Sequence, residues 1–73
     1  MENEKEKPQT TTDLIALVRK DCLHQAKQAH AKLTEAIQHL ENDNHLGALG
    51  AIDGLDDDIA SITVFLKRIV HLT

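Results

Sequence analysis

Histidines and nearby carboxylates are the residues of this chain that could bind a metal ion. The 73-residue sequence contains five histidines, which are His24, His30, His39, His45 and His71. No two of them are four residues apart, the spacing that places two imidazoles on one face of a helix. Asp21 precedes His24 and Glu35 precedes His39, but both pairs face outward on a helical wheel, whereas metal ligands of helical bundles face inward. The sequence therefore predicts no metal site and no cofactor.

Cys22 is the one cysteine and the obvious candidate nucleophile. A single cysteine excludes an intrachain disulfide. Cys22 lies on an apolar stripe, where a free thiol usually packs as a small hydrophobic side chain, and no histidine is placed to act as its base. Because no nucleophile, base and orienting residue come together, we predict that the chain is not an enzyme.

A small anion could bind to a group of basic residues near both ends of the folded segment. The candidate anion-binding residues are Arg19, Lys20, Lys67 and Arg68. Arginine suits phosphate recognition because its planar guanidinium donates two parallel hydrogen bonds. The alternative is a solvated basic surface with no ligand.

Asp58 lies at the flank of an apolar helix face, where a carboxylate normally needs a partner. Either it reaches water at the edge of an interface, or it pairs with His30, with a lysine of the first helix or with a second chain. The small residues Gly50 and Gly54 bracket a segment typical of close helix packing, with no preceding strand and no following Lys-Ser/Thr for a phosphate loop.

The helices that position these residues follow from apolar periodicity. Residues 1–12 are polar, and we expect a disordered tail there. A helix is predicted over 13–41, capped by Thr11, Thr12 or Asp13. Its apolar stripe follows a three-four spacing through Ile15, Val18, Cys22, Ala26, Ala29, Leu33, Ala36 and Leu40.

A turn over 42–45 and a second helix over 46–72, capped by Asp43 or Asn44, complete the expected hairpin. The second stripe consists of Ile52, Leu55, Ile59, Ile62, Leu66 and Ile69. Three glycines between 47 and 54 each cost about 1 kcal/mol in a helix, so 44–54 is either the start of this helix or a loop. We favour the helix. The short turn makes the helices antiparallel and places Cys22 opposite Phe65.

Composition excludes two classes of partner. The net charge is −4, the pI is about 5.6, and one Phe is the only aromatic residue. Nucleic-acid binding needs a basic surface and aromatic stacking platforms, so we expect no nucleic-acid partner. No segment approaches the ~20 apolar residues of a membrane span, and we expect a cytoplasmic protein with no membrane partner.

The apolar surface of the second helix is too wide for one neighbour, because its apolar residues span roughly 160° of the helical wheel. A chain this small also gains little stability from its own core. We therefore expect a second copy of the chain or another protein to cover the surface. The predicted interface residues are Leu14, Leu17, Ile52, Phe65, Val70 and Leu72.

Charge predicts how two copies would meet. Residues 35–58 carry acidic side chains and no Lys or Arg, whereas residues 14–34 and 59–73 are mainly basic, with Asp21 as their one acidic residue. Side-by-side hairpins would then attract when antiparallel. The expected fold is an all-α, antiparallel two-helix hairpin that forms a homodimeric four-helix bundle. The expected function is a non-enzymatic protein–protein interaction module of the adaptor, chaperone or inhibitor type. The alternative is an oligomer that sequesters an anion such as a nucleotide at the basic end.

Overall fold

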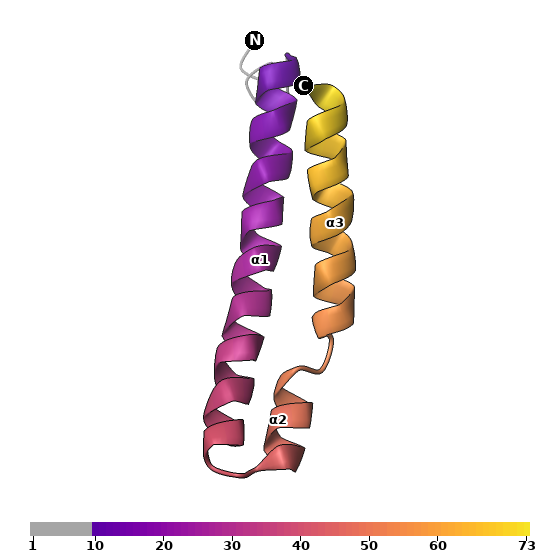
Figure 1. Cartoon of the computed structure of the whole chain (residues 1–73). Helices are drawn as coiled ribbons and strands as arrows, with labels where there is room; N and C mark the ends of the chain where they lie inside the picture. The colour runs from indigo at the N-terminus through magenta and orange to yellow at the C-terminus, as the bar shows by residue number, and fades with distance from the viewer. Residues whose placement is uncertain (1–9) are drawn as a thin grey trace.

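The computed structural model describes residues 10–73 and is an antiparallel helical hairpin (Figure 1). The first arm is α1 (Thr11–Glu41), and the second arm contains α2 (His45–Ala51) followed by α3 (Leu55–Leu72). Both helices of the second arm pack against α1. Between residues 10 and 73 there is no β-strand. The all-α prediction is therefore confirmed, and the second arm is bent rather than straight.

Helix α1 begins two residues earlier than the sequence analysis predicts. Thr10 is the N-cap, and its Oγ1 accepts a hydrogen bond from the Asp13 amide at 3.1 Å. Thr11 and Thr12 therefore belong to the first helical turn, and the predicted tail loses its last residues to α1. The remainder of that tail, residues 1–9, lies outside the described residues.

The chain reverses over residues 42–44, close to the predicted turn. Asp43 has a φ of 56°, the left-handed conformation that ends helices. The Asn44 amide donates to the His39 carbonyl oxygen at 2.8 Å. Asn44 then caps α2, because its Oδ1 accepts from the Gly47 amide at 2.9 Å. Asn44 thus both closes one helix and starts the next.

The predicted helix over 46–72 is interrupted at 52–54, which corrects the expectation of one continuous helix. The Leu55 amide donates to the Ile52 carbonyl oxygen at 2.9 Å, and Gly54 has a φ of 81°. A positive φ ends regular α-helical geometry, and glycine adopts it without steric cost. The glycine-rich segment is therefore neither wholly helix nor wholly loop: it forms the short helix α2 and then a turn.

The core between the arms is narrow and consists of small side chains. The Cα extents are 57 × 26 × 14 Å, so the hairpin is one helix layer thick. The buried hydrophobic residues are Val18, Cys22, Ala29, Ala36 and Ala48. No large side chain within 10–73 is fully buried. The close approach of the arms at these small residues leaves the larger aliphatic side chains along the edges of the contact.

Candidate interaction face

The Lys32–Asp58 ion pair shows which residues of the two arms share a side of the hairpin. Lys32 Nζ lies 2.7 Å from Asp58 Oδ2, linking α1 to α3. At about 100° per residue, Lys32 lies to one side of the buried line through Cys22, Ala29 and Ala36. Asp58 must therefore lie on the same side of α3. We call this side of the hairpin the ion-pair face.

The opposite side carries large aliphatic residues of all three helices. On α1, Leu33 and Ile37 lie across the buried line from Lys32, and on α3, Ile59 lies across from Asp58. We name this surface the apolar face and define it as Leu33, Ile37, Leu40, Leu49, Ile59, Leu66 and Val70. These side chains are between 46% and 71% exposed. The apolar face thus extends along nearly the whole second arm, whereas on α1 it covers the turn half.

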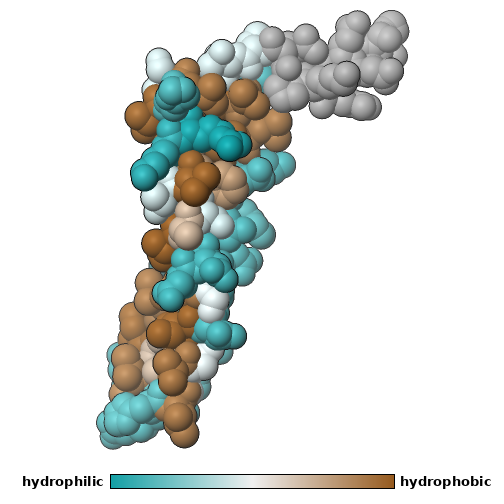
Figure 2. Space-filling model, turned by 90° about the vertical axis from the view of Figure 1, so that its right-hand side faces the viewer, coloured by the Kyte–Doolittle hydropathy of each residue, from teal (hydrophilic) through white to brown (hydrophobic). Residues whose placement is uncertain are grey.

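Figure 2 shows the hairpin from the side of α3, so that its two faces appear at the left and right edges. In the lower half, hydrophobic colouring gathers toward the left edge and hydrophilic colouring toward the right. In this half the separation agrees with the helical-wheel assignment of an apolar face and an ion-pair face, whereas the two colours are mixed in the upper half. The two sides of the hairpin therefore differ in chemistry most clearly near the turn.

The six predicted interface residues are divided between the two faces. Ile52 and Val70 lie on the side of the apolar face, whereas the helical wheel places Leu14, Leu17, Phe65 and Leu72 on the side of the ion-pair face. Leu14 and Leu17 are exposed, and Phe65 is half-buried. A shallow apolar hollow is lined by Ala60, Ser61, Val64 and Phe65. Four of the predicted residues came from the edges of the apolar arc of the second helix, and Leu14 and Leu17 came from a separate patch near the open end, so the set spans both faces.

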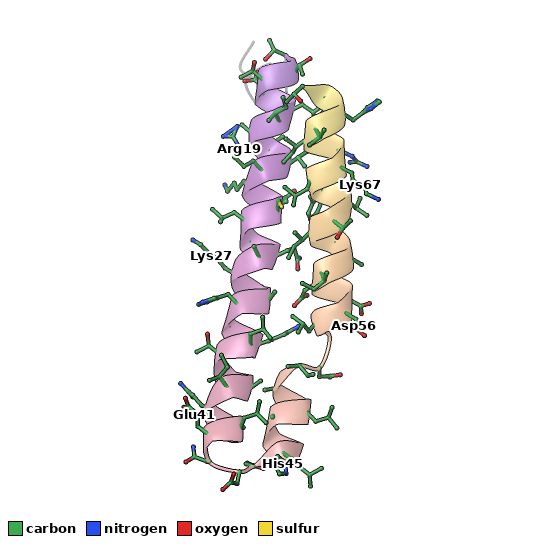
Figure 3. The ribbon with its side chains drawn as sticks, in the orientation of Figure 1. Arg19, Lys27, Glu41, His45, Asp56 and Lys67 are labelled. Atoms are coloured by element: carbon green, nitrogen blue, oxygen red, sulfur yellow. The ribbon has the colours of Figure 1, made fainter. Side chains whose placement is uncertain are left out.

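Two of the predicted anion-binding residues, Arg19 and Lys67, point in different directions within one chain. Arg19, Lys20, Lys67 and Arg68 are all exposed. Figure 3 shows Arg19 pointing away from α3 and Lys67 pointing away from α1, on opposite sides of the hairpin. A single chain therefore presents these two cations to different regions of solvent.

The ion pair answers the question that the sequence left open for Asp58. Its partner is Lys32, a lysine of the first helix, and not His30. The Asp58 side chain is 14% exposed and that of Lys32 is 27% exposed. Dissolved salt screens a partly buried ion pair less than a fully exposed one. The pair therefore helps to set the position of α3 against α1.

Cys22 and the histidines are also placed by the hairpin. Cys22 is buried, and its Sγ lies 4.0 Å from the carbonyl oxygen of Ile62, about one helical turn from the predicted neighbour Phe65. In the part of the chain that the structure describes, no three His, Cys, Asp or Glu side chains are grouped as metal ligands. His39 instead lies at the turn, with Nδ1 3.2 Å from Asn44 Nδ2.

The sequence predicted Asn44, with Asp43 as the alternative, as the cap of the second helix, and Asn44 is the residue that caps α2. It did not predict that His39 lies against this cap. Gly47 follows Asn44 by three residues, the spacing at which an Asn side chain caps a helix. A Cβ at Gly47 would lie 2.5 Å from both Asn44 Nδ2 and His39 Nδ1. The glycine therefore provides the space that this side-chain cluster occupies.

Comparison of the chain with models of known protein families, with curated proteins and with solved structures finds no match. Among the helices of residues 10–73, none has the length and apolarity needed to cross a bilayer.

Proposed function

We propose that this chain is a small non-enzymatic protein–protein interaction module that acts as a self-associating helical hairpin. The observation that carries the proposal is that small side chains are buried between the arms while large aliphatic side chains are exposed. The buried residues are alanines, a valine and a cysteine, whereas the leucines and isoleucines of the apolar face are about half exposed. Contiguous exposed apolar surface of this kind is typical of interfaces.

The free energy available from covering the apolar face supports association. Full burial of a Leu or Ile side chain contributes roughly 1.5–3 kcal/mol. The side chains of the apolar face retain about half of their surface, so covering each contributes about 1 kcal/mol. Several such contributions along one face favour a second helical layer over solvent.

The position of Cys22 supports a binding role rather than a catalytic one. Its thiol is buried between the arms against the backbone of Ile62. A thiol in this environment contributes to packing as a small apolar group. We therefore assign Cys22 to the core of the hairpin.

Light scattering over a range of protein concentrations tests the proposal, with 8.1 kDa as the mass of one chain. Ile37 and Val64 form a matched pair for substitution, because their exposed fractions are 54% and 55%. Ile37 lies on the apolar face, whereas Val64 lies on the outer side of α3. Ile37→Lys should raise the dissociation constant at least about tenfold, since burying an unpaired charge is costly. Val64→Lys should leave it nearly unchanged.

Two outcomes would contradict the proposal. A mass of one chain at every concentration would show that the apolar face does not mediate self-association. Equal effects of Ile37→Lys and Val64→Lys would show that the interface lies elsewhere. Circular dichroism of both variants verifies that the helices persist.

A further inference from the structure

We infer that the occupant of the apolar face is a second copy in antiparallel orientation, with α1 packed on α1 and α3 packed on α3 of the partner. This inference rests on the proposed function and adds the geometry of the assembly. The resulting unit is a four-helix bundle. Its two-fold axis lies in the plane of the interface and is perpendicular to the long axis of the hairpin. The acidic turn of each copy then lies near the basic open end of the other.

The charge distribution along the hairpin favours this orientation. The turn half, residues 35–58, carries Glu35, Glu41, Asp43, Asp53, Asp56 and Asp57, besides Asp58, which pairs with Lys32. The described part of the open half, residues 10–34 and 59–73, carries Arg19, Lys20, Lys27, Lys67 and Arg68 against Asp13 and Asp21, and is therefore basic on balance. The hairpin is 57 Å long, much longer than the ~8–10 Å Debye length at physiological ionic strength. Each end therefore responds to the end that lies beside it, and parallel copies would place like charges together.

Arg19 and Glu41 are the residues that report this orientation most directly. Arg19 precedes Ile37 by about five full helical turns, so both lie on one line along α1. Glu41 follows Ile37 by about one turn. Figure 3 shows the Arg19 and Glu41 side chains on the same side of α1, near opposite ends of the hairpin. Both residues thus lie along the α1 rim of the apolar face.

A two-fold axis level with His30 relates these two residues. His30 lies midway between Arg19 and Glu41 along α1. The symmetry operation brings Arg19 of one copy level with Glu41 of the other, and it does so twice. Opposite charges then flank both ends of the contact between the two α1 helices, as charged pairs flank the apolar seam of coiled coils.

Parallel copies would reverse the environment of Arg19. With the two-fold axis along the hairpin, α1 of one copy would face α3 of the other at the same level. Arg19 would then lie near Lys67 of the partner copy, and the two positive charges would repel. Arg19→Glu consequently has opposite effects in the two arrangements, which makes it a decisive variant.

Sedimentation equilibrium of Arg19→Glu, Glu41→Lys and the double variant at low salt tests the orientation. Each single charge reversal should raise the dissociation constant of the dimer about tenfold. It replaces the two attractive contacts between Arg19 of one copy and Glu41 of the other by two repulsive ones. The double variant should return it to within about threefold of the original value. Lys27→Glu is the control: it makes the same charge change as Arg19→Glu near the middle of α1, and should shift the constant by less than about threefold.

The outcomes separate this inference from the proposed function. A single-chain mass for the unaltered protein would contradict the proposed function itself. Tighter association of Arg19→Glu would establish the parallel arrangement and overturn the orientation while leaving self-association intact. The antiparallel orientation would also be overturned if Arg19→Glu and Glu41→Lys changed the dissociation constant no more than Lys27→Glu does and the double variant did not restore it. If circular dichroism shows that a reversal unfolds the chain, Arg19→Gln and Glu41→Gln provide the comparison, with smaller increases expected and no increase overturning the orientation.

Discussion

Lys32 Nζ on α1 lies 2.7 Å from Asp58 Oδ2 in the first turn of α3, so one ion pair joins the two arms near the bend of the second arm. The same ammonium group would lie 3.0 Å from a Cβ at Gly54. The lysine therefore occupies the position where the second arm changes from the turn into α3. Both the pair and the glycine contribute to how α3 starts.

Loss of the ion pair should destabilise the hairpin by a modest amount. Asp58→Asn should lower the free energy of unfolding by about 1 kcal/mol, because it removes a partly buried charged hydrogen bond. Asp57→Asn is the matched control, since Asp57 is an exposed neighbour in the same first turn. Urea unfolding followed by circular dichroism measures both. Equal losses in the two variants would mean that the helix dipole, not Lys32, accounts for the effect of Asp58.

Alanine substitutions at two glycines of the second arm should change stability in opposite directions. Gly54→Ala should destabilise by about 1 kcal/mol, because its φ of 81° is unfavourable for alanine. Gly50→Ala should stabilise by roughly 0.5–1 kcal/mol, since Gly50 is helical and has no atom within 4 Å of an added Cβ. Thermal and urea unfolding compare the two variants directly. A stabilising Gly54→Ala would contradict the bend at 52–54.

The Asn44 cap should contribute measurably to α2. Asn44→Ala removes the acceptor for the Gly47 amide and should cost about 1 kcal/mol of unfolding free energy. Asn44→Asp retains a capping oxygen, so its free energy of unfolding should fall by at most a few tenths of a kcal/mol. Amide hydrogen exchange at residues 45–51 reports the local effect, with faster exchange expected only in the alanine variant. Unchanged exchange there would show that packing of Ala48 alone holds α2.

The thiol of Cys22 should react slowly in the folded protein. Its side chain is buried between α1 and α3, and a thiol reagent must contact sulfur directly. We expect labelling to be at least about tenfold slower under native conditions than in concentrated denaturant, because it requires local opening. With a reagent that releases a chromophore when it reacts with the thiol, absorbance measures the rate of labelling. Similar rates in both conditions would show that the arms separate readily at this level.

The extent of the helices was largely predictable because helix formation depends on local spacing. The three-four stripe on the first arm predicted α1, and the burial of Val18, Cys22, Ala29 and Ala36 confirms which side packs. The turn after Glu41 followed from a short polar segment. These features depend on residues close together in sequence, so a single sequence contains the information that determines them.

Only the tertiary structure decided where the second arm bends and which residues of the two arms lie on the same face of the hairpin. Any of three glycines could have interrupted the helix, and the positive φ falls at Gly54, between the end of α2 at Ala51 and the start of α3 at Leu55. Likewise, Asp58 had several potential partners until the register of the arms placed it beside Lys32. Close contact at small residues then left Leu33 and Ile37 half exposed, although Leu33 lies on the predicted stripe. Helical periodicity specifies a direction around one helix, whereas the separation and relative rotation of two helices depend on which side chains meet between them.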